Sequence, residues 1–251
     1  MKSEQRQIYD PVSETPTSYV REGRVGPDPH PPMDFEAYKS TALRHPKRAL
    51  VYLPQTITEI TGPQLGAALV GETDNDLTIQ HEGMPIGERI TVSGRVIDTE
   101  GKPLRGTLVE IWQANAAGRY LHKWDRWPAE LDPNFSGAGR SLTDDEGRYT
   151  FTTIKPGPYP WGNHYNAWRP AHIHFSLLGR AFVQRLVTQM YFPGDPLFPF
   201  DPIFNSVRDP DARERMISRF SIHDTVPNWA HAYTFDIYLR GPGQTPFEEA
   251  H

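Results

Sequence analysis

Two histidines stand two positions apart in the segment WRPAHIHF, residues 168–175, where they could share one metal ion. If this segment is an extended strand, successive side chains alternate between its faces, so His172 and His174 project to the same side. Their attachment points are then about 7 Å apart, which lets two imidazoles converge on one ion. The spacing alone leaves two interpretations open: a metal site, or a pair of structural histidines.

Two tyrosines upstream of this pair lie in segments that read as turns. Tyr120 ends the motif GRY, two positions after Gly118, and Tyr159 lies in the proline-rich stretch KPGPYPW. Together with the histidines they form a set of two phenolates and two imidazoles, which suits a ferric ion. Spacing alone does not separate these tyrosines from aromatic residues that pack in a core. His164, close to the same loop, is a reserve candidate.

Composition narrows the class of protein. The 251 residues carry a net charge of −5, which provides no broad basic field for nucleic acid or acidic lipid. The absence of cysteine excludes disulfides, thiolate nucleophiles and sulfur ligands, and is compatible with a reducing compartment. The N-terminus has no apolar segment of the kind a secretion signal needs, and no run reaches membrane-spanning length. We therefore expect a soluble, cytoplasmic protein.

The pattern of short apolar alternations predicts an all-β fold, a β-sandwich with short helices and an irregular N-terminal arm. Asp209 followed by Pro210 predicts the start of a short helix that runs to about Phe220. Weaker signals indicate a helical stretch over 35–43 and a strand over 49–53. The predicted strands of the sandwich cover residues 89–97, 108–112, 149–151, 171–178, 182–192 and 233–239, with a turn at 143–147.

The N-terminal region reads differently from the rest. Residues 1–34 are polar and rich in proline, which excludes regular helix there. We predict an arm over residues 1–80 that contributes to a partner contact and to a pocket, and a catalytic sandwich domain over residues 81–251.

Six segments of the chain match a known family: residues 84–89, 108–115, 118–120, 131–135, 153–161 and 168–175. Through them the chain resembles the intradiol ring-cleaving dioxygenases, and within that family the β subunits of the members that cleave protocatechuate. The resemblance covers most of residues 36–245 and is most specific from Tyr159 to His174. A segment around Tyr38 is similar to one that contributes to the substrate pocket of those β subunits, which favours protocatechuate over catechol or hydroxyquinol.

The resemblance implies a function for individual residues. Fe(III) is expected to be bound by Tyr120, Tyr159, His172 and His174, with a hydroxide as fifth ligand. Tyr159 is expected to leave the metal when substrate binds and to accept a proton. Further residues are implied to lie at the substrate: Arg169 and Gln189 beside the reacting ring, and Tyr38, Trp161 and Ile203 around the pocket. The resemblance also implies a homologous α subunit as partner, with O2 and a small catechol as substrates.

Three positions depart from the β-subunit pattern without touching an expected ligand. Gly162 follows Trp161 at a position where an arginine is frequent in the family. Together with His164, this difference is expected to change the charge at the mouth of the pocket. Pro193 and Asp201 also differ from the pattern.

Other classes of protein stay open at this point. A zinc hydrolase could use the two histidines, although it would usually need a third histidine or a carboxylate, and no His-Glu-x-x-His motif occurs. An extradiol Fe(II) oxygenase would need two histidines and a carboxylate. A sandwich subunit without catalytic activity would need no metal. Colour separates these classes, because tyrosinate bound to iron(III) is red-brown and zinc proteins are colourless.

Overall fold

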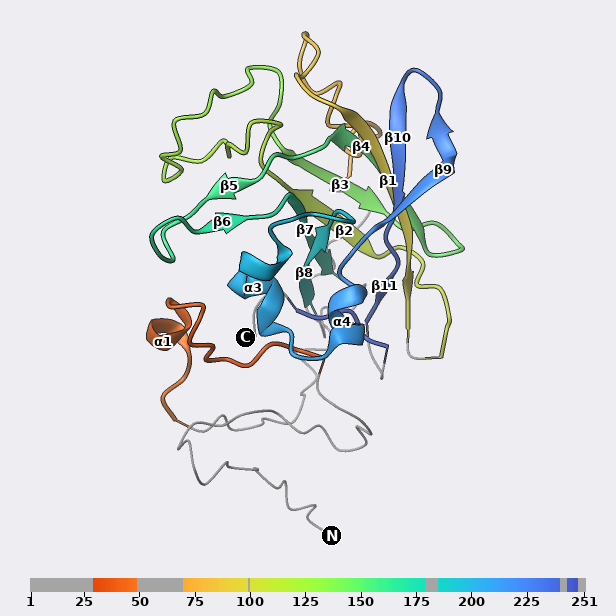
Figure 1. Cartoon of the computed structure of the whole chain (residues 1–251). Coiled ribbons are helices and arrows are strands. Elements are labelled where there is room, and N and C mark those ends of the chain that lie inside the picture. Colours follow the sequence, from red (N-terminus) through yellow and green to blue (C-terminus); the bar gives the residue numbers. More distant parts are fainter. Residues whose placement is uncertain (1–28, 49–69, 99, 179–184, 240–242, 248–251) are drawn as a thin grey trace.

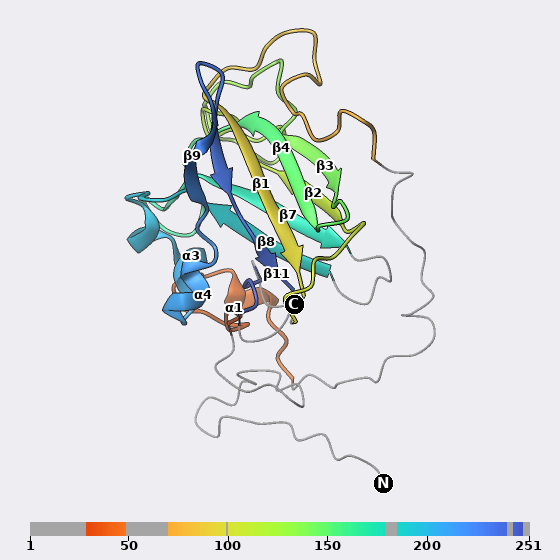
Figure 2. The same cartoon turned by 90° about the vertical axis from the view of Figure 1, so that its right-hand side faces the viewer.

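The computed structural model describes residues 29–48, 70–98, 100–178, 185–239 and 243–247. These residues form two packed β-sheets, a two-stranded ribbon and a few short helices (Figures 1 and 2). The predicted all-β sandwich is confirmed. No helix in these ranges has the length and apolar character that crossing a bilayer requires.

The first sheet is built around its longest strand, β1 (Arg89–Ile97). This strand pairs antiparallel with β4 (Arg148–Ile154) along one side. Along its other side it runs parallel to β10 (Ala230–Thr234) and then to β11 (Ile237–Tyr238), and β10 pairs with the edge strand β9 (Arg219–Val226). The apolar alternation of β1 explains its orientation, because Ile90, Val92 and Val96 are fully buried between the sheets.

The second sheet places both histidines. Its order is β3 (Ala138–Leu142), β2 (Leu108–Trp112), β7 (His172–Leu178) and β8 (Arg185–Tyr191), with antiparallel neighbours throughout. Ile173 and Phe175 of β7 point into the main apolar core between the two sheets. The period of two along a strand therefore turns His172 and His174 to the outer face of this sheet.

The outer face is covered by a ribbon and by short helices (Figure 1). The ribbon pairs β5 (Tyr159–Pro160) with β6 (Trp168–Arg169). After β8 the chain forms the 3-10 helix η2 (Phe198–Phe200), α3 (Pro202–Ser206) and α4 (Pro210–Glu214). A second apolar cluster joins these helices to the end of β8 at Tyr191, together with Phe204, Val207, Ala212 and Met216. A further helix among the described residues, α1 (Thr41–Arg44), lies near the ribbon.

The predicted helix after Asp209 is correct at its start and wrong at its end. The Asp209 side chain accepts a hydrogen bond from the Asp211 backbone N–H, as an N-cap does, but α4 ends at Glu214. Residues 219–226 form β9 instead, because pairing with β10 satisfies their backbone groups. Most side chains of β9 are exposed, so the strand carries no apolar alternation that would have identified it.

Other boundaries also differ from the prediction. The expected strand over 233–239 is interrupted between β10 and β11, and the helical stretch over 35–43 reduces to α1. Strand β3 was not predicted because its sequence, AGRSL, consists mainly of small and polar residues. The predicted strand over 49–53, residues 182–184 and the arm before residue 29 lie outside the described residues. The division near residue 80 stays a prediction, and Leu77 packs in the main core.

Candidate metal centre

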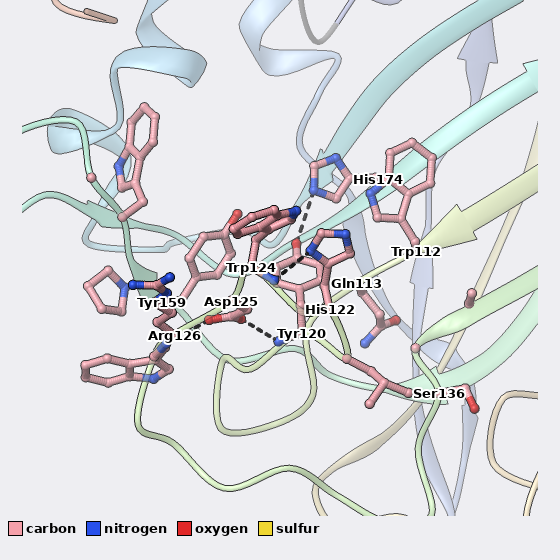
Figure 3. Close-up of a pocket in the computed structure, with 17 residues that line it drawn as sticks. Trp112, Gln113, Tyr120, His122, Trp124, Asp125, Arg126, Ser136, Tyr159 and His174 are labelled. Atoms are coloured by element: carbon pink, nitrogen blue, oxygen red, sulfur yellow. Dashed lines mark hydrogen bonds between the residues drawn. The ribbon is translucent and has the colours of Figure 1, made fainter. Parts of the chain in front are cut away.

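Four aromatic rings from three separate segments meet on the outer face of the second sheet. The Tyr120 hydroxyl lies 3.1 Å from His174 Nε2, and the Tyr159 hydroxyl lies 3.3 Å from His172 Nε2. The rings of the two tyrosines are 5.3 Å apart, and those of the two histidines are 4.8 Å apart. Tyr120, Tyr159 and His174 converge in Figure 3. The structure thus brings together all four side chains that the sequence nominated as metal ligands.

Both histidines are held in fixed orientations. His172 Nδ1 lies 2.7 Å from the Pro170 carbonyl oxygen, which requires a hydrogen on Nδ1 and leaves the lone pair on Nε2. Burial, assisted by the charges of Arg169 and His174, lowers the pKa of His172 well below its usual range. His174 stacks on Trp112 of the neighbouring strand, with the ring centroids 4.7 Å apart. A neutral imidazole with a free Nε2 is the form that binds a metal.

The two tyrosines meet because two glycines let their loops touch. Gly118 has φ +77°, a conformation that favours glycine, and a Cβ added there would lie 2.2 Å from the Pro158 carbonyl oxygen. A Cβ on Gly157 would lie 2.4 Å from the Ala116 carbonyl oxygen. The backbones of the two loops are also joined by a 3.0 Å hydrogen bond from Gly157 N–H to the Asn115 carbonyl. This close approach places Tyr120 beside Tyr159.

The donor set fits a hard trivalent ion better than zinc. Two phenol oxygens can become anionic ligands, and two imidazole nitrogens complete a set of four donors. Among the residues that the structure describes, no group of three or more His, Cys, Asp or Glu side chains is arranged to hold a metal. The third histidine or carboxylate of a zinc hydrolase or an extradiol site therefore has no counterpart in the described part of the chain.

A buried arginine borders the four rings. Arg169 Nη1 lies 3.1 Å from His172 Nε2 and 3.5 Å from the Tyr159 hydroxyl. Its Nη2 lies 2.9 Å from a carboxylate oxygen of Asp201, and both side chains are almost completely buried. Burial by itself would lower the pKa of Arg169, but the negative charge of Asp201, with Tyr191 and Tyr159, outweighs this effect and raises it. Arg169 is therefore a permanent cation beside the cluster.

Gln189 is the second polar residue behind the cluster. It faces His174 across the pairing of β7 with β8, and its Oε1 accepts hydrogen bonds from Arg169 Nη2 at 2.6 Å and from the Tyr191 hydroxyl at 2.7 Å. Its Nε2 is buried and has no hydrogen-bond partner among the described residues. An unpaired buried donor is costly, so Nε2 is available to an acceptor other than the residues that the structure describes.

The three residues predicted to contact substrate lie in different surroundings. Tyr38 packs edge-on against Trp161, with the ring centroids 5.3 Å apart. Asn163 fastens the Tyr38 segment to the loop after Trp161, because its side chain accepts from Lys39 N–H at 3.0 Å and donates to the Ala37 carbonyl at 2.8 Å. Ile203 is buried in α3. His164, the reserve candidate, is exposed, and its Nδ1 lies 2.7 Å from the Tyr165 carbonyl oxygen.

A pocket of about 810 Å³ opens over one side of the cluster (Figure 3). Its volume lies within the range of about 300–1,000 Å³ that small-molecule sites occupy. Arg169, Gln189 and Ile203 are not among the described residues that line it. Sequence reasoning passed over most of its wall, since isolated tryptophans and charged loop residues give no periodic signal. The wall combines Tyr120, Tyr159, Trp161 and His174 with Trp112, Gln113, His122, Trp124, Asp125, Arg126 and Trp127.

Comparison with known proteins identifies the family. A family model described as "Dioxygenase" matches residues 60–241, and one described as "Protocatechuate 3,4-dioxygenase beta subunit N terminal" matches residues 24–56. The chain is 57% identical over 221 residues to the protocatechuate 3,4-dioxygenase beta chain of Burkholderia cepacia, covering 87% of this chain and 94% of that protein. The chain belongs to the intradiol dioxygenase family. Enzymes of this family use non-haem iron.

Two further comparisons show more distant similarity. It is 31% identical over 205 residues to the protocatechuate 3,4-dioxygenase alpha chain of Pseudomonas putida, covering 78% of this chain and 96% of that protein. The crystal structure of 3-chlorocatechol 1,2-dioxygenase from Rhodococcus opacus 1CP superposes with a TM-score of 0.51 at 24% identity, covering 67% of this chain and 65% of that one. That superposition supports the sandwich fold of the intradiol dioxygenases.

Proposed function

We propose that the chain is the iron-bearing β subunit of an enzyme that cleaves protocatechuate with O2 to 3-carboxy-cis,cis-muconate. The observation that carries the proposal is the 57% identity to a protocatechuate 3,4-dioxygenase beta chain over 87% of this chain. The match of residues 24–56 to the N-terminal segment of such beta chains supports the same substrate.

Tyr120, Tyr159, His172 and His174 would hold Fe(III). The charge of the ion explains the choice of ligands, because two tyrosinates and one hydroxide would balance its three positive charges. When bound, the iron would supply a Lewis acid and redox centre at which the two oxygens of a catechol are held. The lone pair that Pro170 leaves on His172 Nε2 supports this assignment.

Tyr159 would act as the proton acceptor during substrate binding. Its side chain lines the pocket, and its hydroxyl also contacts Arg169 Nη1, so it lies where the open pocket meets the buried arginine. A phenolate that leaves the metal at this position can take a proton from the arriving catechol.

Arg169 and Gln189 would stabilise charge on the reacting ring. Nη1 of Arg169 is the guanidinium nitrogen that faces the cluster, and a fixed cation there favours the negative charge that develops during oxygen addition. The unpaired Nε2 of Gln189 adds a donor that needs no reorganisation. Both groups are buried, so water weakens neither interaction.

Tyr38, Trp161 and Ile203 would shape the substrate site, and a homologous α subunit would complete it. The likeness to both a beta chain and an alpha chain of protocatechuate 3,4-dioxygenase supports an assembly of αβ units. In this proposal Asn163 keeps Tyr38 against the pocket wall at Trp161.

The test is co-expression of the chain with an α subunit, followed by metal analysis, a visible spectrum and oxygen uptake. We expect a red-brown protein that contains iron and consumes O2 with protocatechuate faster than with catechol or hydroxyquinol. With isotopically labelled O2, both labelled atoms should appear in the ring-opened product. Faster O2 uptake with catechol or hydroxyquinol would instead identify the enzyme as a catechol or hydroxyquinol 1,2-dioxygenase. A colourless protein without iron would contradict the proposal.

A further inference from the structure

Asp201 forms a buried ion pair with Arg169, the arginine of the proposed site. The Asp201 side chain is fully buried and Arg169 is 3% exposed. Asp201 Oδ2 accepts from Nη2 at 2.9 Å, and Oδ1 lies 3.4 Å from Nε. The carboxylate therefore faces one edge of the guanidinium with both oxygens, the two-point arrangement that fixes the plane of an arginine.

The hydrogen bonds divide the guanidinium into two sides. Nε and Nη2 are directed at protein oxygens, those of Asp201, Gln189 and Tyr191. Nη1 instead faces the cluster, at His172 Nε2 and the Tyr159 hydroxyl. The single lone pair of His172 Nε2 cannot serve both a metal and Arg169, so a metal on this nitrogen would leave Nη1 without that acceptor. Nη1 is then the nitrogen available to a substrate.

Asp201 also organises the neighbouring helix. It is the N-cap of α3, where its Oδ1 accepts from the Ile203 backbone N–H at 3.0 Å. The same carboxylate thus contacts Arg169 and begins the helix that carries Ile203. A buried ion pair contributes little net stability, so stability alone is a weak reason for an acid at this position.

We propose that Asp201 is a positioning residue, which clamps the Nε and Nη2 edge of Arg169 so that Nη1 points at the reacting ring, and which aligns that guanidinium with Ile203. The inference rests on the proposed function. It assigns to Asp201 no contact with the substrate and no proton transfer, only control of the direction in which Arg169 presents its charge.

The test replaces Asp201 in the assembled enzyme. Asp201→Asn keeps an oxygen for the helix cap but removes the charge, and its amide nitrogen opposes the donors of Arg169. We expect iron content to be unchanged and kcat to fall about tenfold or more, with KM changed much less, because the misdirected charge matters mainly in the transition state. The visible spectrum of the anaerobic substrate complex should also shift, since Arg169 borders both Tyr159 and His172.

A matched control exists within the chain. Asp209 caps α4 with the same Asp-Pro sequence, and its Oδ1 accepts from the Asp211 backbone N–H at 3.0 Å, as Oδ1 of Asp201 accepts from the Ile203 N–H. Asp209→Asn should leave kcat and the spectrum of the substrate complex unchanged. An equal effect of both substitutions would overturn the positioning role and assign the effect to helix capping.

A double variant tests whether Asp201 acts through Arg169. In an Arg169→Lys background, Asp201→Asn should lower kcat much less than it does in the wild type, because the planar group to be oriented is gone. Equal losses in both backgrounds would overturn the proposal.

If Asp201→Asn does not fold, Asp201→Ser is judged by the same criteria, and failure of both to fold would assign the pair to structure alone. An inactive wild type would contradict the proposed function, whereas an active wild type with a normal Asp201→Asn variant would contradict only this inference.

Discussion

At the scale of single residues, the chemistry of the site depends on which face of a strand each side chain occupies. His172 and His174 share the outer face of β7, against which Tyr120 and Tyr159 lie, whereas Ile173 between them is fully buried in the core. One strand therefore contributes the proposed metal ligands to one side and apolar packing to the other. The two kinds of residue should respond differently to substitution.

Replacing either histidine by alanine should sharply lower bound iron, because one of the four proposed protein ligands would be lost. Ile173→Ala is the control from the opposite face. It should keep iron but lower the free energy of unfolding by about 2–5 kcal/mol, the usual cost of truncating a buried isoleucine. Iron content per chain and urea unfolding measure the two effects. Equal iron in all three variants would refute the assignment of the two histidines.

The two tyrosines should differ although both are proposed ligands. Tyr159→Phe should still bind iron and catechol, because the substrate supplies the missing negative charge, but turnover should fall as a proton acceptor is lost. Tyr120→Phe should change the colour of the substrate complex most, because the retained phenolate contributes charge transfer after substrate binds. Anaerobic visible spectra with protocatechuate, together with iron content, separate the roles. A larger spectral change in Tyr159→Phe would reverse them.

At the scale of elements, the site depends on the contact between the loop before Tyr120 and the loop before Tyr159. No hydrophobic pattern brings these loops together, and the absence of a side chain at Gly118 and Gly157 allows their backbones to touch. The spacing of the two tyrosines is thus set by backbone contact.

Gly118→Ala should therefore reduce iron binding as well as stability. The added Cβ would overlap the Pro158 carbonyl and push Tyr120 away from Tyr159. Gly101→Ala is a matched control, since Gly101 has a similar φ of +79° but no atom within 4 Å of the added Cβ. It should cost about 1–2 kcal/mol in backbone strain and leave iron unchanged. Iron analysis and thermal unfolding of both variants would test this, and equal iron loss in both would contradict the loop-contact argument.

At the scale of the whole molecule, the packing of the two sheets holds the outer face in place. Tyr149 of β4 lies in the main core, and its hydroxyl donates to the Phe235 carbonyl, in the break between β10 and β11. Burial, with a smaller effect of Asp236, raises the pKa of Tyr149 well above the ordinary tyrosine value. The folded state thus keeps this phenol protonated at pH values where the unfolded chain ionises.

The sign of the pH effect follows from this raised pKa. Below about pH 10, Tyr149 is protonated in both the folded and the unfolded state and adds no pH dependence to the free energy of unfolding. Above that pH, Tyr149 ionises in the unfolded state only, which stabilises the unfolded state and lowers the free energy of unfolding. At pH 8, Tyr149→Phe should lower the free energy of unfolding by about 1 kcal/mol, because one hydrogen bond is lost. Between pH 8 and pH 11, the free energy of unfolding should fall less in this variant than in the unchanged protein. Urea unfolding at both pH values measures this. An equally steep loss in the variant would show that other groups cause the alkaline destabilisation.

Several features of this protein follow from the sequence alone. The i, i+2 spacing of His172 and His174 places them on one face of any strand, and the alternation over 89–97 and 108–112 is enough to locate two strands, because these signals are local. The types of donor, two phenol oxygens and two imidazole nitrogens, can also be read from the sequence, and they favour a hard ferric ion. The resemblance then adds the family, which the comparisons confirm.

Tertiary structure decided the features that depend on contacts between distant residues. Strand β9 exists because it pairs with β10, although its side chains carry no strand pattern. Tyr120 meets Tyr159 because Gly118 lets two loops touch. Asp201 meets Arg169 across 32 positions because η2, which directly precedes Asp201, packs against β6, which carries Arg169. Such pairings are set by the packing of whole elements, which local sequence patterns do not encode.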